Sequence, residues 1–222
     1  MPTSEKPSRR IVIKIPETEQ EFRSMWELNH EVFACEFAQH PRTADGLLID
    51  KFHGKNIYRI AWDGERVLGM ISAHWQPPFS AVQKFGEALE KQLLPGKTGE
   101  IRLFALRKEI RGGVSAIKLG VSIMKELMAQ GMELVVISAI SHQVELYRHI
   151  GFAVQGLPVT ENGIDFYPML GNLKEMTTHH SSPYGRFAKQ PGPSRENRCE
   201  SMAAPKTDVQ CCDGKENDRC GK

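Results

Sequence analysis

Apolar and polar residues follow two different periods along roughly the first 170 residues of this chain. Alternation with a period of two is typical of strands, and recurrence every three or four residues is typical of helices. Alternation or a continuous apolar run predicts strands at residues 10–15, 57–62, 67–75, 100–107, 133–140, 152–157 and 164–170. Helical periodicity predicts helices at residues 18–33, 80–94, 114–130 and 141–150. The folded part is therefore expected to alternate strands with helices.

Short turn and capping signals lie between these segments. Asp63-Gly64 between two apolar runs predicts a hairpin, whose turn the next two polar residues are expected to lengthen. A second hairpin is expected around residues 161–163. Thr18 suits the start of the first helix, and Gly131 suits the end of the helix at 114–130.

The segment from residue 100 to 140 predicts the topology. Its helix is apolar on most faces and its second strand is apolar without alternation, as expected for elements that are covered on both sides. A strand, a buried helix and a buried strand form a βαβ unit with a right-handed crossover and two parallel, adjacent strands. With hairpins on either side, we expect an α/β fold with a mixed, mostly antiparallel central sheet, one parallel βαβ unit and helices on both faces.

The composition changes near Leu170. From Thr177 to Lys222 aliphatic residues are few, so this segment buries too little apolar surface to offset the entropy of ordering. We expect one domain at residues 1–172, followed by a disordered tail or linker at 173–222. Four of the five cysteines lie in that tail without CxxC spacing, which favours reduced thiols over a disulfide framework or a zinc site.

Charge and hydropathy narrow the class of protein. The formal net charge of +2 is too small to favour nucleic acid or an anionic membrane as a partner. No apolar run approaches the roughly 20 residues that cross a bilayer, and the polar N-terminus lacks the apolar stretch of a secretory signal. We therefore expect a cytoplasmic protein with no stable membrane insertion, no nucleic-acid partner and no metal.

Two places could carry chemistry, because ligands of open α/β sheets bind beyond the carboxyl ends of parallel strands. The first is the basic, glycine-containing loop between Leu106 and Gly113, directly before the buried helix. A helix N-terminus with Arg111 beside it suits an anion such as a pyrophosphate, although the same loop would also serve as a plain connection. The second is the segment SHQVELYRHIGF at 141–152, in which Tyr147 is either a core residue or an acid that protonates a departing thiolate.

These two elements resemble the acyl-donor-binding core of the GNAT superfamily of acyltransferases. From Glu100 to Phe152 the order is strand, arginine-rich loop, helix, strand and a short helix that ends in YRHIGF. The segments LNHEVFACEFAQHP at 28–41, LIDKFHGKNIYRIAWDGERVLGMIS at 48–72 and FYPM at 166–169 are similar to N-acyl amino acid synthases and, more distantly, to autoinducer synthases. The resemblance covers roughly residues 11–170.

The sequence also departs from the family pattern. The loop motif Q/R-x-x-G-x-G/A would place its central glycine at Val114, whereas Ala116 fits the last position. The asparagine that often precedes the tyrosine-bearing helix is missing. These departures leave open whether the donor is acyl-CoA or an acyl carrier protein thioester.

The resemblance implies a set of site residues. The donor is expected to contact Leu106, Arg107, Arg111, Gly112, Gly113, Val114, Ser115, Ala116 and Tyr147. It implies Tyr147 as the general acid and a backbone N–H near Leu106, within 105–107, as the oxyanion donor. The general base is left open. Glu100, Glu36 and His40 are the candidates, with Asp50 and His53 near the same pocket, while an ion pair between Glu100 and Arg102 is the structural alternative for Glu100.

Two functions follow as hypotheses. In the first, the chain transfers an acyl group from a thioester to the amine of a small molecule by direct attack in a ternary complex. In the second, it keeps the scaffold as a non-catalytic module that binds an acyl donor. Acyl carrier protein is a further possible partner, as is a PLP-dependent aminotransferase, because some relatives are joined to one.

Overall fold

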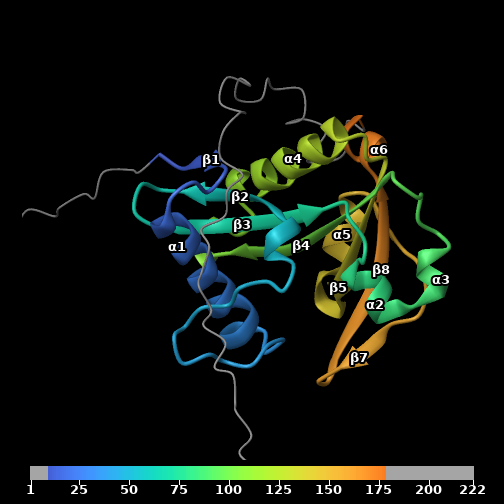
Figure 1. Ribbon diagram of the computed structural model, residues 1–222, viewed down its shortest axis with the longest axis horizontal. Coiled ribbons are helices and arrows are strands. Elements are labelled where there is room, and N and C mark those ends of the chain that lie inside the picture. Colours follow the sequence, from blue (N-terminus) through green and yellow to red (C-terminus); the bar gives the residue numbers. More distant parts are fainter. Residues whose placement is uncertain (1–9, 179–222) are drawn as a thin grey trace, which may run out of the picture. The chain divides into compact units, whose positions relative to one another are not determined.

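One sheet of eight strands organises the part of the chain that this computed structural model describes, residues 10–178 (Figure 1). The strands are β1 (Val12–Lys14), β2 (Ile57–Trp62), β3 (Val67–His74), β4 (Thr98–Leu106), β5 (Leu134–Ile140), β6 (Phe152–Val154), β7 (Val159–Glu161) and β8 (Ile164–Asn172). Their order is β1-β2-β3-β4-β5-β8-β6, and β7 also pairs with β8. β4 and β5 are parallel and the other recorded pairs are antiparallel, which confirms the expected mixed sheet with one βαβ unit.

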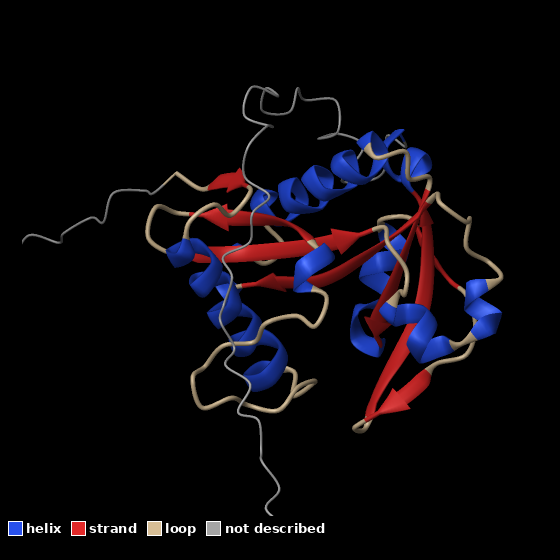
Figure 2. Cartoon of the chain, in the orientation of Figure 1, coloured by secondary structure: helices blue, strands red, loops and turns tan. Residues whose placement is uncertain are grey.

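Helices cover both faces of this sheet (Figure 2). The α-helices are α1 (Glu19–Asn29), α2 (Ser80–Phe85), α3 (Glu87–Glu90), α4 (Val114–Ala129), α5 (Val144–His149) and α6 (Leu173–Thr178). A π-helix, η1 (His30–Glu36), continues α1, and short 3-10 turns form η2 (His53–Lys55), η3 (Lys108–Ile110) and η4 (Ser141–Gln143). Within these residues no helix is both long and apolar enough to cross a membrane.

The period-two alternation of the central strands divides the core into two halves. Ile71 on β3 packs in one hydrophobic cluster with Leu119 of α4, and this cluster also contains buried residues of α5 and α6. Its neighbour Met70 points to the opposite face and packs with Met25 of α1. Successive residues of one strand thus bury against different helices, as the pleat requires.

The predicted start and turn signals are confirmed. Thr18 and Glu21 form a reciprocal capping box at the N-terminus of α1. The Asp63 carboxylate accepts the N–H groups of the two residues that lengthen the β2–β3 turn. Asn162 and Gly163 both adopt positive φ between β7 and β8, as a two-residue hairpin requires.

Two expected elements are wrong in detail. The helix expected at 80–94 is two short helices, because Gly86 has a φ of 75° and interrupts it. The strand expected at 152–157 stops at Val154, and the separate strand β7 pairs with β8 before the final turn.

The folded region extends beyond the expected boundary at residue 172. Residues 173–178 form α6, in which the side chains of Leu173 and Met176 are buried. The helix is capped by Asn172, whose Oδ1 accepts the N–H of Glu175 at 3.1 Å. The domain therefore includes α6, and the rest of the predicted tail, from residue 179 on, lies outside the described residues.

Leu173→Ala tests whether α6 belongs to the core. Deleting a fully buried leucine side chain is expected to lower the free energy of unfolding by about 2–4 kcal/mol. Leu157→Ala is the control, because Leu157 is 87% exposed, and it should change stability by less than about 0.5 kcal/mol. Urea unfolding followed by circular dichroism measures both, and equal stabilities of the two variants would contradict the assignment.

Candidate functional site

The two parallel strands pair only where they begin. β4 and β5 are in register at Thr98↔Leu134, Gly99↔Val135 and Glu100↔Val136, and no pair is recorded between them beyond that point. β4 nevertheless continues beside β3 to Leu106, and β5 continues beside β8 to Ile140. Figure 1 shows β5 and β8 turning away from β2–β4. The carboxyl-terminal halves of β4 and β5 therefore diverge.

A β-bulge lies in β4 on the edge of this opening. Between Ser72↔Arg102 and Met70↔Ala105, Leu103 and Phe104 together oppose the single residue Ile71. Leu103 has a φ of 50°, which is rare for a residue with a Cβ atom. A bulge leaves a residue unpaired with the neighbouring strand, and bulges are common next to active sites.

A cavity of about 380 Å³ occupies the region between the diverging strands. Its apolar walls include Phe33 and Phe37 from η1 and the segment after it, Phe104 of the bulge, Met124 of α4 and Ile137 of β5. Its polar lining includes Glu100 and Arg102 of β4 and, from other elements, His40, Lys51, Gln83, Lys84, Ser138 and Glu161. The cavity thus has an apolar part that suits an acyl chain and a polar part that suits a charged small molecule.

Tyr147 of α5 lines this cavity. Its ring is half-buried and packs edge to face against Phe152 at 5.7 Å between centroids. Burial raises the pKa of its hydroxyl to about 12, so the phenol keeps its proton at neutral pH. Tyr147 therefore packs against the core and also lines the cavity, and its role as an acid stays a prediction.

The predicted donor loop connects β4 to α4. Gly112 adopts a φ of 70°, and Gly113 precedes the first turn of α4 without a side-chain cap. The first N–H groups of a helix have no partner within it, so this end of α4 is open to an anion. Arg111 Nε donates to the Leu106 carbonyl at 2.9 Å and so keeps its guanidinium beside the end of β4. Of the donor residues predicted from sequence, Tyr147 alone is among those that line the cavity.

Both arginines of this loop pair with carboxylates of η1. Arg111 Nη1 and Nη2 contact the two carboxylate oxygens of Glu36 at 2.6 and 2.5 Å, and Arg107 pairs with Glu31. The hydrogen bond from Arg111 keeps the pKa of Glu36 below its usual value. Glu36, a candidate base from the sequence, does not line the cavity and instead joins η1 to the donor loop.

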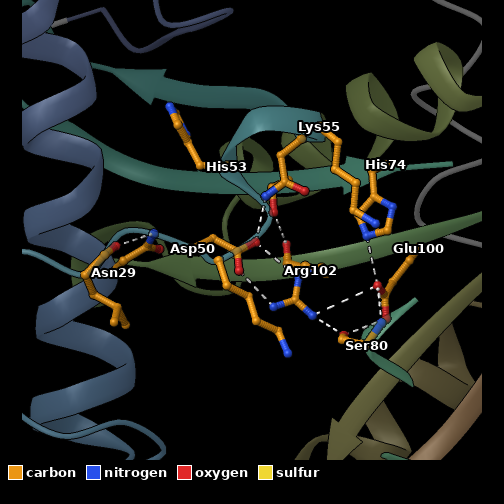
Figure 3. A network of polar contacts seen from close by, with 12 residues as sticks. Asn29, Asp50, His53, Lys55, His74, Ser80, Glu100 and Arg102 are labelled. Atoms are coloured by element: carbon orange, nitrogen blue, oxygen red, sulfur yellow. Dashed lines mark hydrogen bonds and ion pairs between the residues drawn. The ribbon is translucent and has the colours of Figure 1, made fainter. Parts of the chain in front are cut away.

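Glu100 lies in a dense network of hydrogen bonds (Figure 3). Its side chain is 1% exposed, and its oxygens accept from His74 Nε2 at 3.0 Å, Ser80 N at 2.9 Å, Ser80 Oγ at 2.7 Å and Ala81 N at 2.7 Å. Burial would raise its pKa, but the hydrogen bond from His74, the charge of Arg102 and the Ser80 bonds leave the pKa lowered. A carboxylate with four donors is a weak base, so Glu100 is better suited to hold the first turn of α2.

The expected ion pair between Glu100 and Arg102 is loose, at 4.0 Å. Arg102 instead forms a bidentate pair with Asp50, from Nε at 3.1 Å and from Nη2 at 3.0 Å. Burial opposes the ionisation of Asp50, yet the bonds from Arg102 and Asn56 leave its pKa lowered. Arg102 lines the cavity, whereas Asp50 does not line it and binds the Arg102 guanidinium (Figure 3).

Two histidines that the sequence placed near the pocket differ in position. His53 does not line the cavity, because its Nδ1 lies 2.9 Å from the Tyr58 hydroxyl and its ring packs edge-on against Trp26. His40 does line the cavity, on a loop whose N–H groups at Gln39 and His40 both donate to the Phe33 carbonyl. Partial burial and the nearby Arg102 lower the pKa of His40, so its imidazole is neutral at neutral pH.

Of the three backbone N–H groups at residues 105–107 that were predicted to bind the oxyanion, two face β3. The Arg107 N–H donates to the Leu68 carbonyl at 2.8 Å, and by alternation the Ala105 N–H also faces β3. The Leu106 N–H faces the side of β5, but Leu106 does not line the cavity. The bulge residues Leu103 and Phe104 do line it.

Several residues of the polar cavity lining were not predicted from the sequence. Lys51 donates to Gln83 at 3.1 Å, and Lys84 pairs with Glu161 at 2.7 Å, so the loop that carries Lys51, helix α2 and strand β7 meet at the cavity. The buried hydroxyl oxygen of Ser138 has no hydrogen-bond partner among the described residues. Ser138 is the polar position in an otherwise apolar strand, and this signal could have identified it. Within residues 10–178 no cluster of three or more His, Cys, Asp or Glu residues could hold a metal.

Comparison with solved structures finds proteins with the same fold at low sequence identity. BjaI, a CoA-dependent acyl-homoserine lactone synthase with bound SAM and isopentyl-CoA, aligns with a TM-score of 0.59 and 18% identity over 72% of this chain and 82% of its own. FeeM, an N-acyl amino acid synthase from uncultured soil microbes, aligns with a TM-score of 0.62 and 15% identity over 80% of this chain and 98% of its own. A Desulfovibrio desulfuricans protein assigned to the GNAT acetyltransferases aligns with a TM-score of 0.53 and 11% identity over 74% and 99%.

These similarities confirm the fold that the sequence resemblance implied. No protein-family model and no curated protein matches the sequence. The fold is therefore that of the GNAT acyltransferases, including the lactone and N-acyl amino acid synthases.

Glu100→Gln tests the buried network. Its carboxyl pKa is lowered from an ordinary 4.5 in the folded protein, so its stabilisation is present above that value and is lost as the pH falls through the lower folded value. The variant is expected to lose about 3 kcal/mol of unfolding free energy at pH 7 and to show a shallower decline below pH 4.5 than the wild type.

Glu133→Gln is the matched control, because Glu133 pairs with Lys97 at 2.6 Å but is 54% exposed. It should change stability by less than about 1 kcal/mol. Urea unfolding between pH 3 and 7 measures all three proteins. The same pH dependence in Glu100→Gln and the wild type would show that Glu100 is not the group that titrates.

Proposed function

We propose that this GNAT-fold chain is an N-acyltransferase that moves an acyl group from a thioester donor to the amine of a small molecule. The observation that supports the proposal most is the early end of β4–β5 pairing beside a cavity of about 380 Å³. Backbone groups of diverging strands lack strand partners, so an extended amide-containing arm such as pantetheine can bind between them. The structural neighbours include a CoA-dependent synthase and an N-acyl amino acid synthase, which fits this reading.

The donor would bind with its phosphates at the loop before α4 and its thioester in the cavity. Arg111, the N–H groups of the first turn of α4 and the positive end of that helix provide the anion-binding groups. Acyl-CoA and an acyl carrier protein thioester both carry a phosphate on the pantetheine arm, so this chemistry serves either donor. The apolar wall around Met124 and Ile137 would hold the acyl chain.

His40 is the better candidate for the general base. It lines the cavity, and its lowered pKa keeps it neutral and able to accept a proton at neutral pH. Glu36 and Glu100 are both engaged by other groups. His40 would take the proton as the amine nitrogen forms its bond to the thioester carbon.

The tetrahedral intermediate carries negative charge on the former carbonyl oxygen. Leu103 and Phe104 of the bulge line the cavity, whereas Leu106 does not, so a backbone N–H of the bulge is the better candidate to bind that oxygen. When the carbon–sulfur bond breaks, the sulfur leaves as a thiolate, and the Tyr147 hydroxyl gives it a proton. No acyl-enzyme is needed, because holding both substrates in one cavity provides the gain in rate.

The polar lining favours an acceptor with an acidic group. Lys51 and Lys84 approach the cavity from two different elements, and Arg102 is held beside them by Asp50. Such cations suit an amine that also carries a carboxylate, such as an amino acid. Positioning by these groups would bring the amine close to the thioester.

A thiol-release assay tests the proposed function. The protein is incubated with acetyl-, hexanoyl- and dodecanoyl-CoA or the corresponding acyl carrier protein, together with amino acids or with amines that lack a carboxylate. We expect thiol release that depends on an amine and is faster with amino acids. Donor binding without turnover for every combination would refute the enzymatic activity.

Tyr147→Phe tests the general acid. Loss of the hydroxyl should lower kcat on the order of 10²-fold, with little change in donor affinity, because the ring still packs against Phe152. Thermal unfolding checks that the fold is kept. An unchanged kcat would remove Tyr147 from the mechanism.

His40→Gln tests the base through the pH profile. A base must be neutral, and the lowered pKa of His40 places the acidic limb of kcat/KM below its ordinary value of 6.5. Activity of the wild type is therefore expected to persist below pH 6.5 and to fall at lower pH. The variant is expected to lose about 10²-fold in rate and to lose the fall of kcat/KM at acidic pH. Both proteins are assayed with the same acceptor, so that protonation of the acceptor amine affects both pH profiles equally. The same limb in both profiles would contradict the assignment.

A further inference from the structure

The π-helix η1 carries two carboxylates that bind the two arginines of the donor loop. Glu36 holds Arg111 through both of its oxygens, and Glu31 pairs with Arg107. These acids are five positions apart in the sequence. A π-helix brings such positions to one side because its hydrogen bonds join residues five apart, as Phe37 N to Val32 O does at 2.9 Å. The π-helical form of this segment is what allows both acids to face the same loop.

The contacts of Arg111 occupy both edges through which its guanidinium could bind a phosphate at two points. Nη1 and Nη2 both donate to Glu36, and Nε donates to the Leu106 carbonyl. A guanidinium binds carboxylate and phosphate through the same pair of parallel N–H groups. A phosphate can therefore bind Nη1 and Nη2 through this parallel pair only by displacing the Glu36 carboxylate.

The same helix forms part of the cavity wall. Phe33 of η1 and Phe37, the residue after it, both line the cavity, and the loop that carries His40 folds back onto the Phe33 carbonyl. The segment that would hold the acceptor is thus attached to the loop that would hold the donor by the Glu31 and Glu36 ion pairs.

We propose that Glu36 occupies the phosphate-binding position of Arg111 before the donor arrives, and that the donor's phosphate displaces it. The inference rests on the proposed function and extends it to the control of the donor site. Displacement leaves η1 attached to the donor loop through the Glu31–Arg107 pair alone, so the wall formed by Phe33 and Phe37 is less constrained once the donor is in place.

Donor affinity of Glu36→Gln tests the displacement. Glutamine keeps the size of the side chain but removes the charge that competes with phosphate. The side chains of Arg111 and Glu36 are 34% and 30% exposed, so solvent weakens their ion pair and Glu36 is a modest competitor for phosphate. The variant is expected to bind coenzyme A or phosphopantetheinylated acyl carrier protein roughly threefold to tenfold more tightly than the wild type.

Glu109→Gln is the matched control. Glu109 lies in η3 of the same loop and pairs with Arg66 at 2.7 Å, so its replacement removes one negative charge near the donor site without releasing Arg111. Its affinity should stay within about twofold of the wild type. In an Arg111→Ala background, Glu36→Gln should give no gain.

Isothermal titration calorimetry with coenzyme A and with phosphopantetheinylated acyl carrier protein measures the donor affinity of each variant. Equal or weaker binding by Glu36→Gln, relative to Glu109→Gln, would overturn the inference, because Glu36 would then orient Arg111 for the phosphate. If neither donor binds the wild type, the proposed function itself is refuted and the inference with it.

Hydrogen exchange of the peptide 30–37 gives an independent readout. Coenzyme A should speed exchange in this peptide of the wild type, whereas Glu36→Gln should exchange faster already without donor. Slower exchange of the wild-type peptide on donor binding would contradict the release of η1.

Discussion

The structure depends on the point at which β4 and β5 stop pairing. Three residues of each strand are in register, and Glu100 is the last of them on β4. Beyond it both strands keep their outer partners but not each other. Backbone groups left without partners are costly when buried, so a gap of this kind is stable only where water or a ligand reaches it. The cavity, the bulge and Tyr147 all lie along this gap.

The network around Glu100 explains why the gap does not close. Glu100 uses its carboxylate to bind His74 on β3 and the first N–H groups of α2, and Arg102 is turned toward Asp50. These bonds attach β4, at the point where it separates from β5, to α2 and to the loop that carries Asp50 on one face of the sheet. α4 and α5 cover the other face. The buried charges thus hold the geometry of the opening, which is a different task from the proton transfer considered for Glu100 from sequence.

The sequence predicted the elements whose own periodicity defines them. The strands, α4 and the two hairpin turns follow from alternation, continuous apolar runs and turn residues, and the family resemblance placed Tyr147 and the Arg111 loop correctly in the fold. α6 was missed because its composition resembles the tail, although Asn172 as a cap and the spacing of Leu173 and Met176 carry a helical signal. The break at Gly86 was missed because the flanking residues keep helical periodicity.

Other features depend on contacts between distant parts of the chain. Glu36 and Arg111 are 75 residues apart in sequence, and the pairing that removes Glu36 from the cavity requires a π-helix that no local rule predicts. Asp50 and Arg102 meet across 52 residues. The position of His40 likewise depends on a backbone turn that folds onto Phe33. Tertiary contacts therefore place Glu36 outside the cavity, whereas the other two candidate bases, Glu100 and His40, line it.

A crystal structure with an unreactive thioether analogue of an acyl-CoA would show whether a donor binds between the diverging strands. Density for the pantetheine arm is expected between residues 101–106 and 137–140, with the phosphates at the start of α4. An analogue bound elsewhere, with β4 and β5 paired along their whole length, would contradict this binding mode.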